Sequence, residues 1–356
     1  MRRLATAALL VALLAAVGLR PAHAQIYVDK DASGGDGPSW TDAYTDLQTA
    51  INNASSSDEI WIAQGVYTPD GEGDSFTITG DIDGVKVYGG FDGSESNRDE
   101  RDPQANKTIL SGDLDGDDNG DSDNDGIVED ADSGDDGTPD NLNGTNAEHV
   151  LILDGGNDID TDEPDITDAT RIEGIYVTAG QADGSTPDGG GLYCDGQDSG
   201  NQCNPPLVNV VFSGNAAGSG GALYNEGDNG TSSPTIKGST FQGNVATSDG
   251  GAIFNDGDNG DGTSSPEITS STTFEDNSAQ NDGGAMFSDG AGSNGTSSPV
   301  IEDATFTGNS ANDDGGALYN DGSDGGTSNP EITRSTFENN TAGEFNNGTD
   351  TAHGGA

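Results

Sequence analysis

An acid-rich stretch, residues 113–140, contains the side chains best suited to chemistry. Part of it matches a twelve-position calcium-binding loop, in which positions 1, 3, 5, 7, 9 and 12 fall on Asp121, Asp123, Asp125, Ile127 (through its carbonyl), Glu129 and Asp132. Calcium takes about six to eight oxygen ligands, and this spacing, with Gly126 at the tight turn, wraps them around one centre. The sequence therefore predicts a calcium loop without flanking helices. The upstream residues Asp113, Asp115 and Asp117 are candidates for a second ion, and the alternative is a solvated acidic loop.

Basic side chains, which a polysaccharide lyase needs as the base beside its calcium ion, are scarce. Beyond residue 24 they are Lys30, Lys86, Arg98, Arg101, Lys107, Arg171, Lys237 and Arg334. Only Lys237 and Arg334 fall in the regular repeats described below, and neither lies near a distinctive carboxylate cluster. A hydrolase would need two carboxylates at a set separation, and 64 acidic residues do not single out a pair. No catalytic residue is predicted.

The element that must position these residues is a sequence repeat with five copies. Its Phe-x-x-Asn word begins at Phe212, Phe241, Phe274, Phe306 and Phe337, at spacings of 29, 33, 32 and 31 residues. Between these words stands Gly-Gly-Ala with an apolar and an aromatic residue, and then a Pro with Ile two positions later. A repeat of this length without a helical pattern predicts a solenoid of β coils.

Coils stacked about 4.8 Å apart place like residue on like residue. We expect an interior column of the five Phe residues and a second column of Ile236, Ile268, Ile301 and Ile332. Asn215, Asn244, Asn277, Asn309 and Asn340 are expected to form a ladder at a turn, where Asn tolerates left-handed backbone and its amide bonds to neighbouring coils. The Gly/Asp/Asn/Ser/Thr stretch after each aromatic residue is expected to be a surface loop. The predicted fold class is all-β, a right-handed parallel β-helix.

The N-terminal part of the chain predicts a cap for this stack. After a short strand at residues 26–28, apolar residues at Trp40, Tyr44, Leu47 and Ile51 mark one face of a helix over residues 39–53. Ser39 and Asp42 are its expected N-terminal caps. Such a helix would cover the open end of the β-helix, which otherwise exposes core and sheet edges.

Four segments follow from these patterns. Residues 1–24 are a signal peptide, residues 25–112 the cap and first coils, residues 113–146 the calcium-loop insertion, and residues 147–356 the remaining coils. The last four residues begin another Gly-Gly-Ala word, so we expect a fragment of a longer protein.

Residues 1–24 have the three parts of a secretory signal: two arginines, an apolar run and a small-residue cleavage site. No later stretch is apolar enough to span a bilayer, so we expect an exported protein, extracellular or on the outer cell surface. Removal of the signal peptide leaves 8 basic against 64 acidic residues, a net charge of −56. This excludes nucleic acid as a partner and indicates a saline habitat or heavy cation binding, the alternative being an ordinary acidic secreted protein.

The two cysteines, Cys194 and Cys203, bracket one surface loop. Aligned with other repeats, Cys194 takes the position of Asn225, and Cys203 that of Ser232. A disulfide is the default in an exported protein, and closing so short a loop stabilises the fold by about 2–3 kcal/mol.

Residues 58–67, 88–91 and 108–113 resemble the opening coils of secreted bacterial parallel β-helix proteins of the pectate-lyase-like superfamily. The later FxxN and GGA[LIM] words are similar to the repeat of the chlamydial polymorphic outer-membrane proteins, which are surface-exposed autotransporter passengers. The resemblance implies the fold, but that fold hosts lyases, hydrolases and adhesins alike.

Three functions fit these patterns. We expect a non-catalytic scaffold, a monomeric, calcium-loaded, adhesin-like rod whose acidic loops face extracellular glycans or the surfaces of host or neighbouring cells. The alternatives are a calcium-dependent polysaccharide lyase and a glycan-binding module. The latter requires an exposed aromatic line, for which Tyr224, Phe254, Phe287 and Tyr319 are candidates unless they pack inside.

Overall fold

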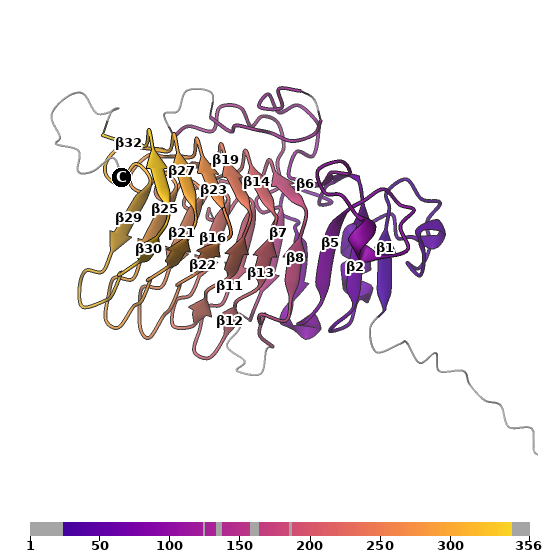
Figure 1. Cartoon of the computed structure of the whole chain (residues 1–356), viewed down its shortest axis with the longest axis horizontal. Coiled ribbons are helices and arrows are strands. Elements are labelled where there is room, and N and C mark those ends of the chain that lie inside the picture. Colours follow the sequence, from indigo (N-terminus) through magenta and orange to yellow (C-terminus); the bar gives the residue numbers. More distant parts are fainter. Residues whose placement is uncertain (1–23, 124, 133–136, 157–163, 185–186, 344–356) are drawn as a thin grey trace, which may run out of the picture.

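The computed structural model describes residues 24–123, 125–132, 137–156, 164–184 and 187–343. Its strands stack side by side along one axis and form parallel sheets that run along the molecule (Figure 1). With about ten coils and a single short α-helix among these residues, the all-β parallel β-helix predicted from the repeats is confirmed. Most of the predicted signal peptide, residues 1–23, and the C-terminal residues 344–356 lie outside the described part.

Each complete coil contributes one strand to each of the long sheets, and the first and last described coils contribute to only some of them. Sheet 1 consists of β1 (Gln25–Val28), β2 (Glu59–Ala63), β5 (Lys86–Phe91), β8 (Arg171–Glu173), β13 (Pro206–Val208), β18 (Thr235–Lys237), β22 (Glu267–Thr269), β26 (Val300–Glu302) and β30 (Glu331–Thr333). Sheet 2 consists of β3 (Gly65–Tyr67), β6 (Thr108–Ser111), β9 (Tyr176–Thr178), β14 (Val211–Ser213), β19 (Thr240–Gln242), β23 (Thr273–Glu275), β27 (Thr305–Thr307) and β31 (Thr336–Glu338).

The remaining strands close the coils. Sheet 3 consists of β4 (Phe76–Thr79), β7 (Leu151–Asp154), β11 (Leu192–Asp195), β16 (Leu223–Glu226), β21 (Ile253–Asp256), β25 (Met286–Asp289) and β29 (Leu318–Asp321). The short sheet 4 consists of β10 (Gln181–Ala182), β15 (Ala216–Ala217), β20 (Val245–Ala246), β24 (Ser278–Ala279), β28 (Ser310–Ala311) and β32 (Thr341–Ala342). β12 (Gln202–Cys203) pairs with β17 (Thr231–Ser232) at the base of the loops.

The predicted columns of like side chains are present. Strand register in sheet 2 pairs each Phe with the next, from Phe212 to Phe337. Their rings stack nearly parallel, with centroids between 4.5 and 5.0 Å apart. Ile236, Ile268 and Ile301 are likewise paired in sheet 1 and fully buried, whereas Ile332, which pairs with Ile301 in the last described coil, is 42% exposed. Position within the repeat therefore supplies a core that the low apolar content alone does not.

The asparagine ladder is also present, but for a different backbone reason. Each side chain donates its amide N–H to the amide oxygen of the next, as Asn244 does to Asn277 at 2.9 Å and Asn277 to Asn309 at 2.8 Å. The expected left-handed Asn is wrong, because the left-handed residue is the one before it, for example Gly243 or Asp276. The preceding residue makes the turn, and the Asn side chain is free to point inward and bond.

The capping helix is shorter than expected. α1 spans Leu47–Asn53, and its N-cap is Asp46, whose carboxylate accepts from the Thr49 N–H at 2.6 Å. The predicted helix over residues 39–53, capped by Ser39 and Asp42, is wrong in its first half. Trp40 there belongs to the short 3-10 helix η1 (Trp40–Asp42), and the backbone of Tyr44 is extended and bridges to β1. The apolar residues do recur at helical spacing, but the backbone of Tyr44 makes its hydrogen bonds to the edge of β1 and not within a helix.

α1 does cover the open end of the solenoid, as predicted. It buries Leu47, Ala50 and Ile51 against the core. The Gln48 amide bonds to both the N–H and the C=O of Thr77 in β4, the first strand of sheet 3, at 2.8 and 3.2 Å. One side chain therefore occupies edge groups that would otherwise be open for pairing. Two further 3-10 turns, η2 (Gly80–Ile82) and η3 (Arg98–Glu100), lie in the first coils.

The acidic insertion, residues 113–146, leaves the coils after β6 and returns before β7, and it lies over the short sheet 4 (Figure 1). Its residues Val128, Ala131 and Leu142 form a small apolar cluster with Ala179, Ala216 and Val245. The Ala131 N–H donates to the Gly243 carbonyl at 3.0 Å. The insertion is therefore packed along several coils rather than projecting into solvent.

Candidate functional site

The structure brings four of the six predicted calcium ligands together. Asp121, Asp123, Asp125 and Glu129 each offer a carboxylate oxygen, and these oxygens all lie within 4.8 Å of one another. We call this group the loop cluster. Four carboxylates this close repel one another unless a cation or protons lie between them.

Local backbone geometry holds the loop cluster in place. The carboxylate of Asp121 accepts from the N–H groups of Asp125 at 3.1 Å and of Gly126 at 2.9 Å. The carboxylate of Glu129 accepts from the Ser122 N–H at 2.8 Å, which folds the end of the loop back on its start. Gly126 has φ +89°, and a Cβ there would lie 2.8 Å from a Val66 methyl group. The glycine therefore permits both the turn and its close approach to the solenoid.

The last predicted ligand lies elsewhere. Asp132 is 2% exposed, and its carboxylate accepts from the Gly137 N–H at 2.6 Å and the Ser278 hydroxyl at 3.3 Å. It is not a member of the loop cluster, so its assignment to position 12 is corrected: this carboxylate ties the insertion to β24. Ile127, expected to offer its carbonyl, buries its side chain.

A lysine that the spacing did not reveal contacts the loop cluster. The Lys107 ammonium forms an ion pair with Asp125 and lies 5.5 Å from the ring centroid of Tyr176. The hydrogen bond to Asp125 raises the pKa of Lys107 above its ordinary value. Lys107 directly precedes β6, and sequence patterns could not show that the insertion folds back over this strand.

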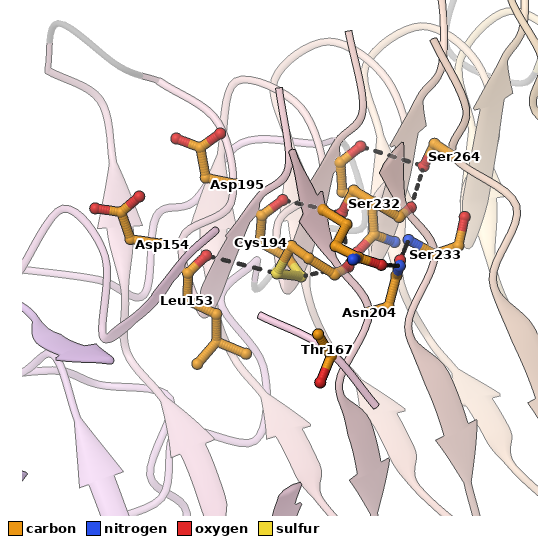
Figure 2. Close-up of a disulfide and its surroundings, with 12 residues drawn as sticks. Leu153, Asp154, Thr167, Cys194, Asp195, Asn204, Ser232, Ser233 and Ser264 are labelled. Atoms are coloured by element: carbon orange, nitrogen blue, oxygen red, sulfur yellow. Dashed lines mark hydrogen bonds between the residues drawn. A yellow bond between two sulfur atoms is a disulfide. The ribbon is translucent and has the colours of Figure 1, made fainter. Parts of the chain in front are cut away.

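The two cysteines form the expected disulfide at the base of one loop (Figure 2). Their Cα atoms are 5.7 Å apart, and register pairs Cys194 with Asn225 and Cys203 with Ser232, as the repeat alignment predicted. Both cysteines are fully buried, which makes the bond part of the core rather than a reactive surface group.

The disulfide lies at the head of a column of serine side chains that sequence reasoning missed. Ser232 donates its hydroxyl to the Cys194 carbonyl at 3.0 Å, and Ser264 donates to the Ser232 carbonyl at 3.0 Å (Figure 2). Ser297 continues the pattern at 2.9 Å. The Ser-Ser-Pro or Ser-Asn-Pro word in each repeat was a signal for this column. The disulfide closes the loop of one coil, and the serine hydroxyls link each later coil to the coil before it.

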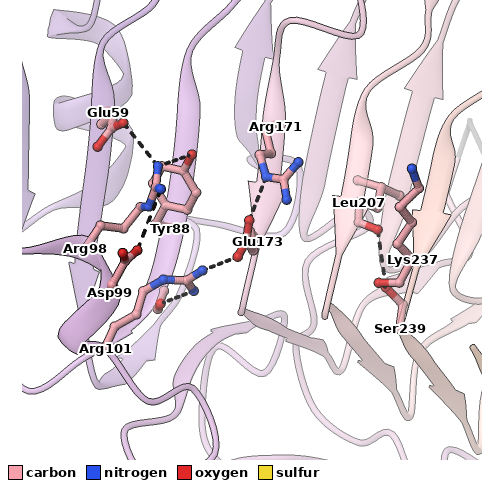
Figure 3. Close-up of polar contacts among 11 residues, drawn as sticks. Glu59, Tyr88, Arg98, Asp99, Arg101, Arg171, Glu173, Leu207, Lys237 and Ser239 are labelled. Carbon is pink, nitrogen blue, oxygen red and sulfur yellow. Dashed lines mark hydrogen bonds and ion pairs between the residues drawn. The ribbon is translucent and has the colours of Figure 1, made fainter. Parts of the chain in front are cut away.

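Most basic side chains are engaged in ion pairs, several of them on the outer face of sheet 1 (Figure 3). Arg101 and Arg171 both bind Glu173, and Arg171 does so at 2.6 Å. Arg98 lies over the Tyr88 ring, 5.0 Å from its centroid. In the regular coils Arg334 is paired with Glu302 and Asp303, whereas exposed Lys237 forms no ion pair with a described residue.

The aromatic residues proposed as a glycan platform form a second column outside the main core. Tyr224, Phe254 and Phe287 are stacked 5.0–5.2 Å apart, and each is only 7–8% exposed. Tyr224 donates its hydroxyl to Asp256 at 2.5 Å. Tyr224, Phe254 and Phe287 are therefore buried by packing, which was the alternative to an exposed aromatic line, whereas Tyr319 stacks on Phe287 at the end of the column and stays partly exposed.

These features define a parallel β-helix protein with an N-terminal cap and a packed acidic insertion. The family model for the Chlamydia polymorphic membrane protein repeat matches residues 209–226, 238–256, 271–285 and 303–321. The chain is therefore a β-helix protein that carries polymorphic membrane protein repeats, as the FxxN and GGA words predicted. Such repeats and a disulfide are features of surface or extracellular proteins.

Other comparisons add little about activity. The pectin methylesterase from Aspergillus niger, solved in a penultimately deglycosylated form, is 14% identical, with 94% of this chain and 91% of that chain covered, at a TM-score of 0.30. That score is too low for an argument from its activity. No curated protein matches the chain. No helix in the described residues is long and apolar enough to cross a bilayer.

Proposed function

We propose that this protein is a non-catalytic scaffold of the cell surface or extracellular space, a rod that presents acidic loops for adhesion and carries calcium in its insertion. The observation that supports this best is the equivalence of successive coils. In the regular coils residues of the same kind pair in register, Phe with Phe in sheet 2 and apolar with apolar in sheets 1 and 3. A Thr bridge also recurs at the base of each loop, from Thr231 through Thr263 and Thr296 to Thr327. An active site requires one coil to differ from its neighbours, whereas a scaffold does not.

Calcium fits the loop cluster by chemistry and by geometry. Its donors are all carboxylates, which hard cations prefer, and backbone N–H groups already hold Asp121 and Glu129 in place. Lys107 supplies a positive charge to one side of the cluster only. We expect calcium to bind Asp121, Asp123, Asp125 and Glu129, and the Asp123→Asn variant to lose this binding in titration calorimetry. Equal heats for the variant and the wild type would contradict the assignment.

The pairing of basic side chains argues against a lyase. A catalytic base must be free to take a proton from the substrate. The Lys107 ammonium is paired with Asp125, and the Arg334 guanidinium is held by Glu302 and Asp303.

A second candidate, glycan binding, is favoured by one specific feature. A cavity of about 410 Å³ opens between the turn at residues 102–104 and sheet 2, where it is lined by Tyr176, Val211 and Thr240. Tyr176 offers an aromatic ring at the wall of this cavity. Such a ring suits a sugar, because an aromatic face packs on a pyranose ring.

One experiment separates the three functions. The protein is incubated with polygalacturonate and with alginate, with and without calcium, while unsaturated products are followed by absorbance and binding by calorimetry. The scaffold predicts neither turnover nor saturable binding. Turnover that is lost in Lys237→Ala or Arg334→Ala would establish a lyase. Binding without turnover that is lost in Tyr176→Ala would establish a glycan module.

We further propose a salt-adapted bacterial source. A net charge of −56 opposes folding through self-repulsion that dissolved salt screens. The wild-type protein should unfold at a higher temperature as KCl is raised from about 0.05 M to 1 M, over which the Debye length falls from about 13 to 3 Å. An unfolding temperature that is constant or falls over this range would argue for an ordinary acidic secreted protein.

A further inference from the structure

A second group of carboxylates gathers where the insertion leaves and rejoins the solenoid, a region we call the neck. Asp113 and Asn146 face each other there in an antiparallel bridge. The Leu114 N–H donates to the Thr145 carbonyl at 3.2 Å, and the Ala147 N–H donates to the Gly112 carbonyl at 2.9 Å. The two ends of the insertion are thus held side by side.

The neck concentrates negative charge in a confined space. Carboxylate oxygens of Asp113, Asp117 and Asp118 lie within 4.8 Å of one another. Gly144 closes over them: a Cβ there would lie 2.3 Å from Asp117 Oδ1 and 2.6 Å from Asp115 Oδ1. Among the described residues no Lys, Arg or His forms an ion pair with Asp113, Asp117 or Asp118, in contrast to Asp125 in the loop cluster.

An independent feature at the same place points to a ligand. Asn146 is only 5% exposed, yet its amide oxygen has no donor in the described part of the chain. Its amide nitrogen lies 3.4 Å from Asp118 Oδ1 and 3.2 Å from Gln181 Oε1, which fixes the head group against the carboxylates. Asp118 Oδ2 is likewise buried and has no donor. Two unsatisfied buried oxygens in one place are costly for a fold unless something positive binds both.

We propose that the neck is a second cation site, in which Asp113, Asp117, Asp118 and the amide oxygen of Asn146 bind one calcium ion. All of these donors are oxygen atoms, the set that hard divalent cations take, and the carboxylate of Asp115 lies beside that of Asp117 under Gly144.

The neck ion would fasten the insertion to the β-helix. Its ligands come from both ends of the insertion, and Asn146 also bonds to Gln181 in β10. Closing the ends of a long segment removes loop entropy from the unfolded chain, so ion binding there stabilises the folded insertion. This inference rests on the proposed role of calcium in the insertion but not on the loop cluster itself.

The test is a calorimetric titration of the whole protein with CaCl2 in about 1 M KCl, which screens the diffuse attraction of cations to an acidic chain. The wild type should bind two ions. Asp118→Asn should bind one ion, at the loop cluster, and Asp123→Asn should bind one ion, at the neck. The control Asp261→Asn, the same charge change on an exposed loop, should still bind two. If Asp118→Asn binds as many ions as the wild type, the neck site is refuted. If only Asp123→Asn retains the wild-type number, the loop cluster fails and the neck stands.

Thermal unfolding supplies a second readout, in which the difference in unfolding temperature between Asp118→Asn and the wild type should change sign when calcium is added. In a chelator, Asp118→Asn should unfold at or above the wild-type temperature, because it removes a buried charge and its amide can donate to Asp113 or Asp117. In calcium the order should reverse. If Asp118→Asn does not fold, Asn146→Ala takes its place and should likewise lose one ion. An order of unfolding temperatures that is the same with and without calcium would overturn the proposal.

Discussion

Truncating Asn277, in the middle of the asparagine ladder, tests how the solenoid is held together. The side chain is fully buried and donates its amide to Asn309 at 2.8 Å and to the Phe241 carbonyl at 3.0 Å. Its oxygen accepts from the Asn244 side chain at 2.9 Å and from the Asn244 backbone N–H at 3.1 Å. In Asn277→Ala the backbone N–H of Asn244 loses the acceptor that this side chain provides.

The expected cost follows from these contacts. One orphaned buried N–H costs about 1–3 kcal/mol, and two lost amide-amide bonds cost about 1 kcal/mol each, so the free energy of unfolding should fall by about 3–5 kcal/mol. Urea titration followed by circular dichroism measures this. The control is Asn281→Ala four residues on, where an exposed amide donates to the Ser248 hydroxyl at 3.1 Å, and the expected loss is below about 1 kcal/mol. If Asn277→Ala costs no more than Asn281→Ala, the ladder does not stabilise the stack.

Three further outcomes are expected. Replacing both Cys194 and Cys203 by Ser should lower the free energy of unfolding by about 2–3 kcal/mol in urea titration, and an unchanged midpoint would show that the serine column alone suffices. Burial raises the pKa of Glu226 from 4.5 to about 8, so the stability that comes from its neutral form is present below about pH 4.5 and is lost as the pH rises through 8. Glu226→Gln should therefore flatten the fall in unfolding temperature between these limits, and parallel profiles would contradict this. Gly126→Ala should weaken calcium binding, because it strains a backbone at φ +89° and clashes with Val66, and wild-type affinity would argue against the loop cluster.

The repeat made the architecture predictable because each column needs only identity and spacing. Five Phe and Asn positions at a near-constant period specify which side chains meet, whatever path the loops take between them. The same alignment placed Cys194 beside Asn225 and Cys203 beside Ser232, so the disulfide could be predicted as well.

Features without a repeat were less predictable. The apolar spacing over residues 39–53 predicted a helix, and one forms in the second half of this segment. The spacing could not show that Tyr44 pairs with β1 or that Asp46 is the N-cap of the helix. The insertion has no second copy with which to align it. Its spacing brought Asp121, Asp123, Asp125 and Glu129 together, yet tertiary contacts drew Asp132 to Ser278 and brought Lys107 to Asp125.

Removing one whole coil tests most directly the claim that the coils are equivalent and hold one another through aligned columns. Deleting residues 274–305 joins Thr273 to Phe306, and because Ser310 then occupies the place of Ser278, every column keeps its register. This variant should unfold in a single cooperative transition with the wild-type circular dichroism per residue. Deleting residues 274–289, half a coil, should leave the chain without a cooperative transition. The claim is contradicted if the two deletions behave alike, whether both fold or both fail.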